Sequence, residues 1–284
     1  MPLPPPSQFN RPNALVVLSG GQDSTTCLFW AKQYFEQVHA ITFNYGQRHS
    51  IELEAAARVA KLAGVTSHKF VDVPNILGGT SPLTDPAQQL EMYADHDSMA
   101  ETIGNRVEKT FVPMRNALFL TIAANHAVCL GVDHLVTGVC QADNANYPDC
   151  RQQFISAQQH TIQEALGRPA GFMIHTPLMN LTKAESIMLA ASLGDCYEAL
   201  AFSHTAYDGT YPPVSKDHAS VLRAHGFEMA DMPDPLVIRA CREGLMPMPG
   251  TANYQHNDFN VDLAARILAM THKLCLVDSQ GAQQ

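Results

Sequence analysis

The chain has 284 residues, of which 46% are hydrophobic and 16% charged, which excludes a disordered or collagen-like polymer. Its 18 Lys and Arg face 27 Asp and Glu, and the formal charge of −9 argues against non-specific binding to duplex DNA. The apolar stretches 14–18 and 119–124 are much shorter than the roughly 20 residues of a membrane helix, so no membrane-spanning segment is expected.

The N-terminus and the cysteines predict a cytoplasmic protein. Residues 1–12 are rich in proline, lack the basic-then-apolar pattern of a signal peptide and are expected to form a flexible tail. The seven cysteines are odd in number and scattered, and no two have the spacing of metal ligands. This usage is typical of reduced thiols and not of a disulfide framework.

Strand-like and helix-like segments alternate from residue 14 onward. The patterns predict strands at 14–18, 39–43, 70–73 and 134–139, and helices at 24–34, 51–62, 115–130, 152–166, 183–193 and 261–274. Such alternation predicts an α/β fold, a doubly wound parallel sheet of about five strands with a smaller C-terminal lobe. In this fold a ligand binds at the carboxyl ends of the strands, where the strand order reverses.

Two other segments have a distinct character. Residues 74–108 contain three prolines and three glycines and are too long for an ordinary connection, which predicts a functional or partly disordered loop. The last helix carries an apolar stripe that covers a core or a partner subunit, with the core favoured. The stripe consists of Val261, Ala264, Ile267, Leu268 and Leu274.

A glycine-rich loop follows the first predicted strand directly. It reads Ser19-Gly20-Gly21-Gln22-Asp23-Ser24 and leads into a helix, so backbone N–H groups and two hydroxyls face whatever binds there. A phosphate fits these donors, and Asp23 beside it predicts a bridging Mg²⁺. The loop matches neither the Walker pattern nor the dinucleotide-binding pattern.

Six collinear motifs extend this observation and together resemble one enzyme family. They are SGGQDSTTCL (19–28), TFNYGQRH (42–49), FVPMRNALFL (111–120), TGVC (137–140), YPDCR (147–151) and TPLMNLTKAE (176–185). The first resembles the phosphate loop of the PP-loop ATP pyrophosphatases, which cleave ATP between its α- and β-phosphates. The whole set, within residues 14 to about 227, is similar to the 7-cyano-7-deazaguanine (preQ0) synthase family of the queuosine pathway.

The resemblance implies a role for individual residues. ATP would be bound by the loop residues Ser19, Gly20, Gly21, Gln22, Asp23 and Ser24, with Thr42, Phe43 and Tyr45 at the adenine. Asp23, Arg115 and Lys183 would be catalytic, the two cations neutralising charge as pyrophosphate leaves. Arg115, Asn116, Tyr147, Asp149 and Arg151 would bind the deazaguanine. The resemblance also divides the chain into an ATP-binding domain at 13–200 and a C-terminal lobe at 201–284.

One feature of the family is missing. Its members carry four zinc cysteines near the C-terminus, and Ala206, Val214, Asp217 and Ser220 stand in those places here. Ala and Val cannot ligate a metal, so we expect no zinc. A substitute site of His204, Asp217, His218 and His225 is a weaker alternative, because surface His and Asp are usually just solvated. The sequence therefore resembles a divergent member of this family.

The resulting functional hypothesis is an AMP-forming enzyme that uses ATP and Mg²⁺ to adenylylate 7-carboxy-7-deazaguanine and transfers it to an amine. The amine is ammonia, which gives preQ0, or a protein amine in a specialised operon such as a phage-defence system. Two alternatives stay open: a tRNA sulfurtransferase using Cys140 and Cys150, and a silent nucleotide-sensing protein. A homodimer is expected from the resemblance and from the C-terminal apolar stripe.

Overall fold

The computed structural model describes residues 12–47, 51–74, 76–141, 146–169, 171–255 and 257–281. The predicted tail lies outside these residues except for Pro12, and so do Arg48 and His49 of the second motif. In the described ranges, no helix combines the length and the apolar character needed to cross a membrane.

Five parallel strands form one sheet in the order β3-β2-β1-β4-β5. The chain moves outward from β1 to β3 and then returns to build β4 and β5 on the other side of β1. The order therefore reverses between β1 and β4, which is where a doubly wound sheet binds its ligand. The predicted fold class is confirmed. The strands are β1 (Ala14–Val17), β2 (Val38–Asn44), β3 (Ser67–Asp72), β4 (His134–Val136) and β5 (Met173–His175).

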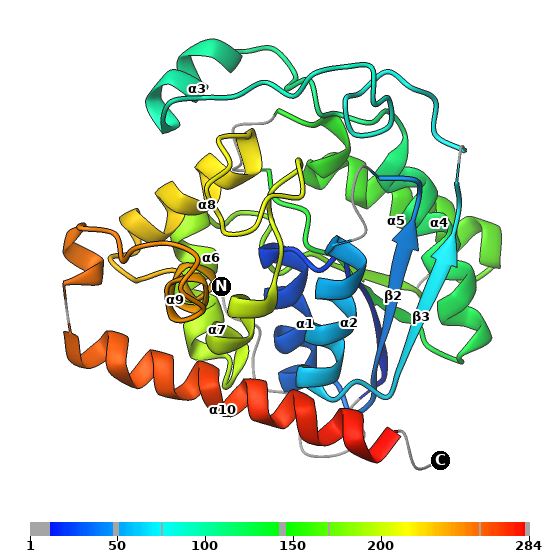
Figure 1. Cartoon of the computed structure of the whole chain (residues 1–284). Helices are drawn as coiled ribbons and strands as arrows, with labels where there is room; N and C mark the ends of the chain where they lie inside the picture. Colours follow the sequence, from blue (N-terminus) through cyan, green and yellow to red (C-terminus); the bar gives the residue numbers. More distant parts are fainter. Residues whose placement is uncertain are drawn as a thin grey trace.

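Helices cover both faces of this sheet (Figure 1). In β1, Ala14 and Val16 point into one hydrophobic cluster and Leu15 into the other, because side chains alternate along a strand. The first cluster is completed by α1 (Gln22–Tyr34), α2 (Ile51–Ala63), α6 (Lys183–Ser192) and α7 (Cys196–Ala199). The second is completed by α4 (Arg115–Cys129) and α5 (Gln152–Leu166).

The C-terminal part adds three helices, α8 (His218–Met229), α9 (Pro235–Arg242) and α10 (Asn257–Gly281). Helix α10 runs along the lower edge of the molecule and packs on α9, α7 and α2 (Figure 1). Phe227, Ile238 and Leu263 belong to the same hydrophobic cluster as β1 and α1. The C-terminal part thus shares its core with the sheet, and the domain boundary at residue 200 stays a prediction.

Three strands differ from the sequence prediction, and β3 does so by beginning at Ser67 instead of residue 70. Strand β5 was not located, because its three residues are too few to give an alternating signal. Strand β4 ends at Val136 and not at residue 139, because the chain turns past the phosphate loop there. At Gly138 a Cβ atom would lie only 3.0 Å from the carbonyl carbon of Asp23, so this crossing requires a glycine.

The apolar stripe predicted in the last helix is wrong at two positions. Val261 and Leu268 are 67% and 42% exposed, whereas Leu263, Ile267 and Met270 face the core. The helix carries apolar residues on more than one face, so its pattern alone could not decide which face is buried. Helix α9 was also missed, since it lies in a stretch rich in Met and Pro.

The long segment 74–108 follows a defined path in its described residues, which favours the functional interpretation. It contains α3 (His96–Ile103), whose Met99 and Ile103 pack against Val221 and Leu222 of α8. In the part of the chain that the structure describes, three short 3-10 helices complete the elements: η1 (Pro148–Cys150), η2 (Leu200–Phe202) and η3 (Ala252–Tyr254).

Candidate active site

The glycine-rich loop is held in shape by its own hydroxyl groups. The Oγ atoms of Ser19 and Ser24 lie 3.0 Å apart, and Ser24 Oγ also accepts a hydrogen bond from the Ser19 N–H at 3.2 Å. The Gly21 N–H donates to Ser19 Oγ at 3.3 Å, and Gly21 is the N-cap of α1. These hydrogen bonds therefore set the shape of the loop without a bound anion. The positive end of α1 faces the space beside the loop.

Gly20 fixes this loop against neighbouring parts of the chain. Its φ of +85° is open to glycine, and a Cβ atom there would lie 2.4 Å from the carbonyl oxygen of Glu52 in α2. Its own carbonyl accepts a hydrogen bond from the His204 N–H at 2.9 Å. The phosphate loop thus contacts α2 on one side and residue 204 on the other.

Lys183 and Asp23 form an ion pair at the N-terminus of α1. The Lys183 Nζ lies 2.9 and 3.1 Å from the two carboxylate oxygens of Asp23. Lys183 opens α6, where Thr182 and Glu185 form a capping box. Gly226 of α8 packs against the lysine stem, since a Cβ there would lie 2.4 Å from Lys183 Cγ. The cation is therefore positioned by two helices.

Aromatic rings and a buried guanidinium form the opposite wall. Phe43 and Phe119 stack with ring centres 4.3 Å apart, and Tyr45 lies 5.5 Å from Phe119. Burial disfavours the charge of Arg115, but nearby groups that include Tyr45 and Tyr147 outweigh burial and raise the pKa of Arg115. Arg115 therefore stays a cation in this wall.

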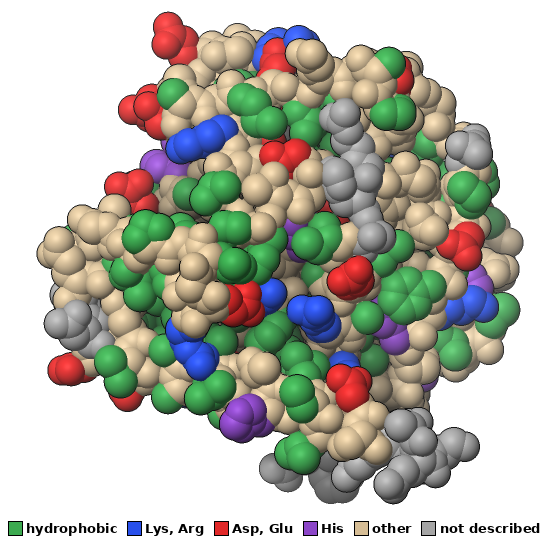
Figure 2. All heavy atoms as spheres, in the orientation of Figure 1, with side chains coloured by type: hydrophobic (Ala, Val, Ile, Leu, Met, Phe, Trp, Pro, Cys, Tyr) green, Lys and Arg blue, Asp and Glu red, His purple; other side chains and the backbone are tan. Residues whose placement is uncertain are grey.

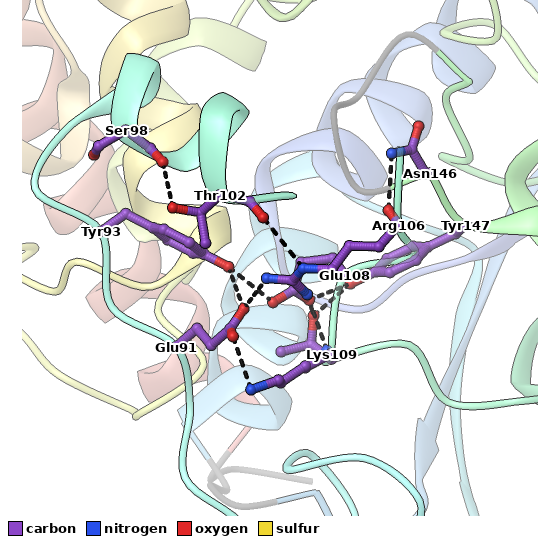
Figure 3. A network of polar contacts seen from close by, with 10 residues as sticks. Glu91, Tyr93, Ser98, Thr102, Arg106, Glu108, Lys109, Asn146 and Tyr147 are labelled. Carbon is purple, nitrogen blue, oxygen red and sulfur yellow. Dashed lines mark hydrogen bonds and ion pairs between the residues drawn. The ribbon is translucent and has the colours of Figure 1, made fainter. Parts of the chain in front are cut away.

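One of the predicted deazaguanine-binding residues, Tyr147, is held by a polar network (Figure 3). The Tyr147 hydroxyl donates to buried Glu108 at 3.2 Å, and Thr110 bonds to both residues. The Asn146 amide donates to the carbonyl of Arg106 at 2.9 Å. Segment 91–110 thereby fixes the position of Tyr147, which gives the long segment a structural role at the site.

These groups surround one cavity of about 330 Å³ at the carboxyl ends of the strands. Among its walls are twelve of the predicted site residues: Ser19, Gly21, Gln22, Asp23, Ser24, Phe43, Tyr45, Arg115, Asn116, Tyr147, Arg151 and Lys183. The structure thus brings together motifs that lie up to 164 residues apart in the chain, from Ser19 to Lys183.

Three predicted site residues lie behind the cavity wall. Gly20 packs on α2, as described above. The Thr42 hydroxyl donates to the carbonyl of Leu18 at 2.6 Å, which joins β2 to the end of β1. Asp149 accepts a hydrogen bond from the Asn116 N–H at 3.3 Å, and burial raises the pKa of its carboxyl. These three residues therefore hold the phosphate loop, the end of β1 and the start of α4 in place.

Sequence reasoning missed two titratable groups in the cavity. Glu52 lies in the first turn of α2, and burial raises the pKa of its carboxyl to about 7, although Arg115 opposes this shift. The signal was present, because Glu52 follows the second motif by three residues. His218, at the start of α8, also lines the cavity, and no motif pointed to a substrate contact there.

The residues in the places of the zinc cysteines are linked in another way. The Asp217 carboxylate accepts hydrogen bonds from the Tyr207 N–H at 2.5 Å and the Ser220 N–H at 2.8 Å. It therefore links the chain around residue 207 to the start of α8. Of the other two positions, Ala206 is buried and Val214 is exposed. Within the described ranges, no three His, Cys, Asp or Glu side chains gather closely enough to hold a metal ion.

The chain was compared with known proteins. The family model "Queuosine biosynthesis protein QueC" matches residues 13–231. The 7-cyano-7-deazaguanine synthase of Gloeobacter violaceus is 49% identical over 78% of this chain and 94% of its own length. Those of Laribacter hongkongensis and Chromobacterium violaceum are 48% and 45% identical, over 80% and 84% of this chain and 95% and 98% of their own. The chain therefore belongs to the QueC family of queuosine biosynthesis proteins, which are ATP-dependent enzymes of the ligase type.

Proposed function

We propose that this protein makes the nitrile preQ0 in the cytoplasm in two ATP-dependent halves. First it adenylylates 7-carboxy-7-deazaguanine, and ammonia displaces AMP to give the amide. A second ATP then activates the amide oxygen, which leaves with AMP to give the nitrile. The observation that carries the proposal is that one cavity is lined both by the phosphate loop with Lys183 and by Arg115 with Tyr147. An adenylylation needs the α-phosphate of ATP and the carboxylate of the acid in contact. One undivided cavity allows this contact, and the 45–49% identical relatives are named as synthases of this nitrile.

Each half of the cavity has a chemical task in this proposal. The N–H groups of the loop and α1 bind phosphate oxygens, and Lys183 stabilises the charge that grows on the leaving pyrophosphate. Phe43 and Tyr45 offer flat surfaces to the adenine, while Arg115 and Tyr147 contact the acid. Glu52, with a pKa of about 7, is suited to accept a proton from the attacking amine.

Mg²⁺ fits the residues of the loop. Asp23 presents one carboxylate in the first turn of α1, beside the space for the phosphates. Mg²⁺ usually binds one or two carboxylates together with substrate phosphates, so the ion would arrive with ATP and be held by Asp23. When bound, it neutralises charge on the phosphate oxygens.

The first experiment is a turnover assay with purified protein, ATP, Mg²⁺ and 7-carboxy-7-deazaguanine, with and without ammonium, read by mass spectrometry. The proposal expects AMP and the nitrile, both dependent on the acid. Lys183→Met, prepared in the same way, should lose about 10²-fold or more of the AMP release, because one charge-stabilising group is removed. Lys32→Met, on the far part of α1, should behave as wild type.

The remodelled segment around Ala206, Asp217 and Ser220 supports a second version of the reaction, in which the amine belongs to a protein of a phage-defence system. In that case the assay yields AMP or a trapped adenylate but no nitrile. The next search would then be for a protein that carries an added deazaguanine mass.

A tRNA sulfurtransferase is the competing enzyme class, and the structure gives it a specific test. Cys140 and Cys150 both line the cavity, and either thiol could carry a persulfide there. Replacing both by serine should leave AMP and nitrile formation within about twofold of wild type. Loss of turnover in this double variant would favour sulfur transfer. A nucleotide sensor would bind ATP without consuming it.

We also propose a homodimer. Apolar side chains are exposed at several points along the edge formed by α10, among them Val261, Leu268 and Leu276 (Figure 2). Light scattering after size-exclusion chromatography should give twice the mass of the chain. The double variant Val261→Lys, Leu268→Lys should give the monomer mass.

A further inference from the structure

His218 begins α8 inside the segment that replaces the zinc cysteines of the family. Its neighbour Asp217 is the N-cap of this helix and accepts a hydrogen bond from the Ser220 N–H. The first turns of the helix line the cavity through His218, Ala219 and Leu222. The remodelled segment therefore contributes a wall of the active-site cavity and not only a fold-stabilising loop.

The imidazole of His218 is buried without a hydrogen-bond partner on one of its nitrogens. The residue is 3% exposed, and among the described residues none bonds to its Nε2 atom. A buried polar atom without a partner is costly, so such an atom in a cavity wall indicates a bound molecule. Both polar atoms of the Gln22 side chain, in the same wall, lack a partner too.

The charged groups around His218 place it between the two halves of the cavity. The charged or titratable groups near enough to influence the pKa of the imidazole are Glu108, Lys183, Asp217 and His96. Lys183 belongs to the nucleotide half, where it pairs with Asp23. Glu108 belongs to the acceptor half, where its carboxylate accepts a hydrogen bond from the Tyr147 hydroxyl. The carboxyl group that is adenylylated must lie where these halves meet.

We propose that His218 binds the reacting carboxyl group of the acceptor, with its Nε2–H donating a hydrogen bond to a carboxyl oxygen. This inference rests on the proposed function. An ionised carboxyl group only accepts hydrogen bonds, and its burial requires donors. A neutral histidine supplies one N–H, and burial lowers the pKa of His218, which keeps the ring neutral at pH 7. The ligand class is thus a flat heteroaromatic carboxylic acid whose carboxylate points toward the α-phosphate of ATP.

The test compares His218→Leu, His218→Gln and the control His225→Leu in the full-length protein. His225 lies on the same helix but outside the cavity, where its ring stacks on His96 at 3.8 Å. We expect His218→Leu to raise the KM for the acid about 10- to 100-fold, since one hydrogen bond to a charged group is lost. The KM for ATP should stay within about twofold of wild type. His218→Gln, which keeps an N–H donor, should recover most of the affinity, and His225→Leu should match wild type.

Three outcomes overturn the inference. An unchanged KM for the acid in His218→Leu shows that the ring does not contact it. An equal rise of both KM values indicates a structural role, as does a failure of His218→Gln to recover affinity. If His218→Leu does not fold by circular dichroism, titration calorimetry of the acid into wild type and His218→Gln decides, and a loss of binding in the glutamine variant contradicts the proposal. If wild type itself releases no AMP with this acid, the proposed function fails first.

Discussion

At the scale of the residue, Gly20 combines a backbone requirement with a packing requirement. Its φ of +85° strains any other residue, and its missing Cβ leaves room for the carbonyl of Glu52. Gly131 has a similar φ of +69° but open space around it. A substitution at Gly131 therefore measures the cost of the backbone conformation alone, whereas one at Gly20 measures that cost together with the cost of the close contact.

We predict that Gly131→Ala lowers the free energy of unfolding by about 1–2 kcal/mol, which is the cost of the left-handed conformation. Gly20→Ala should lower the free energy of unfolding by about 1–3 kcal/mol more than Gly131→Ala does, because the added methyl group overpacks the contact with α2. It should also weaken ATP binding, because the loop must move away from α2. Urea unfolding and ATP titration measure the two effects. Equal stability losses in the two variants, with ATP affinity kept in both, would contradict the prediction.

Residues also show why only part of the site was predictable. The phosphate loop could be identified because its chemistry is contiguous in the sequence, and its residues line the cavity. Thr42 was assigned to the adenine site by its place in a motif, yet its hydroxyl bonds to Leu18. His218 was named only as a weak alternative metal ligand, because only the packing of α8 beside Lys183 brings it to the cavity.

At the scale of the element, the Asp217 carboxylate connects the loop around residue 207 to the start of α8. Asp95 is a matched comparison, because it caps α3 in the same way through the Ser98 N–H, but among the described residues its carboxylate accepts no hydrogen bond from the backbone of a second segment. We predict that Asp217→Ala lowers the free energy of unfolding by about 2–4 kcal/mol and that Asp95→Ala lowers it clearly less. Urea unfolding curves measure the difference.

Metal removal completes this test. If the carboxylate of Asp217 has taken over the linking role of a metal, EDTA should leave the Tm of wild type unchanged. Added zinc should not restore the stability of Asp217→Ala. A fall of several degrees in the Tm of wild type with EDTA would instead reveal a structural metal.

The segment that carries α3 depends on the Glu91 carboxylate (Figure 3). Burial by itself raises the pKa of Glu91, but contacts with Lys109, Arg106 and Tyr93 outweigh it and lower the pKa to about 2. A carboxylate with a lowered pKa stabilises the fold above its unfolded value of roughly 4.3, and this stabilisation is lost as the pH falls toward 2.

We therefore predict that Glu91→Gln lowers the free energy of unfolding by about 1–3 kcal/mol at pH 7. The difference from wild type should shrink as the pH falls from 5 to 3. Glu101→Gln, at an exposed position of α3, serves as the control and should show no such dependence. A difference that stays constant over this range would exclude the carboxylate charge as the cause.

At the scale of the whole molecule, α10 is part of the core although it lies outside the residues matched by the family model. Ile267 is 1% exposed and its neighbour Leu268 is 42% exposed. We predict that Ile267→Ala costs about 2–5 kcal/mol, while Leu268→Ala costs less than about 1 kcal/mol. Thermal and urea unfolding of the two variants measure this contrast. Similar losses at both positions would mean that the outer face of α10 is also covered.

The sequence by itself determined the α/β class, the phosphate loop and twelve of the residues that line the cavity, because these depend on local periodicity and on contiguous chemistry. Tertiary structure alone decided three things: the place of the short strand β5, the buried face of α10, and the entry of Glu52 and His218 into the cavity. The physical reason is the same for each. A side chain's environment is set by which elements pack together, and residues far apart in the chain carry no local signal of that packing.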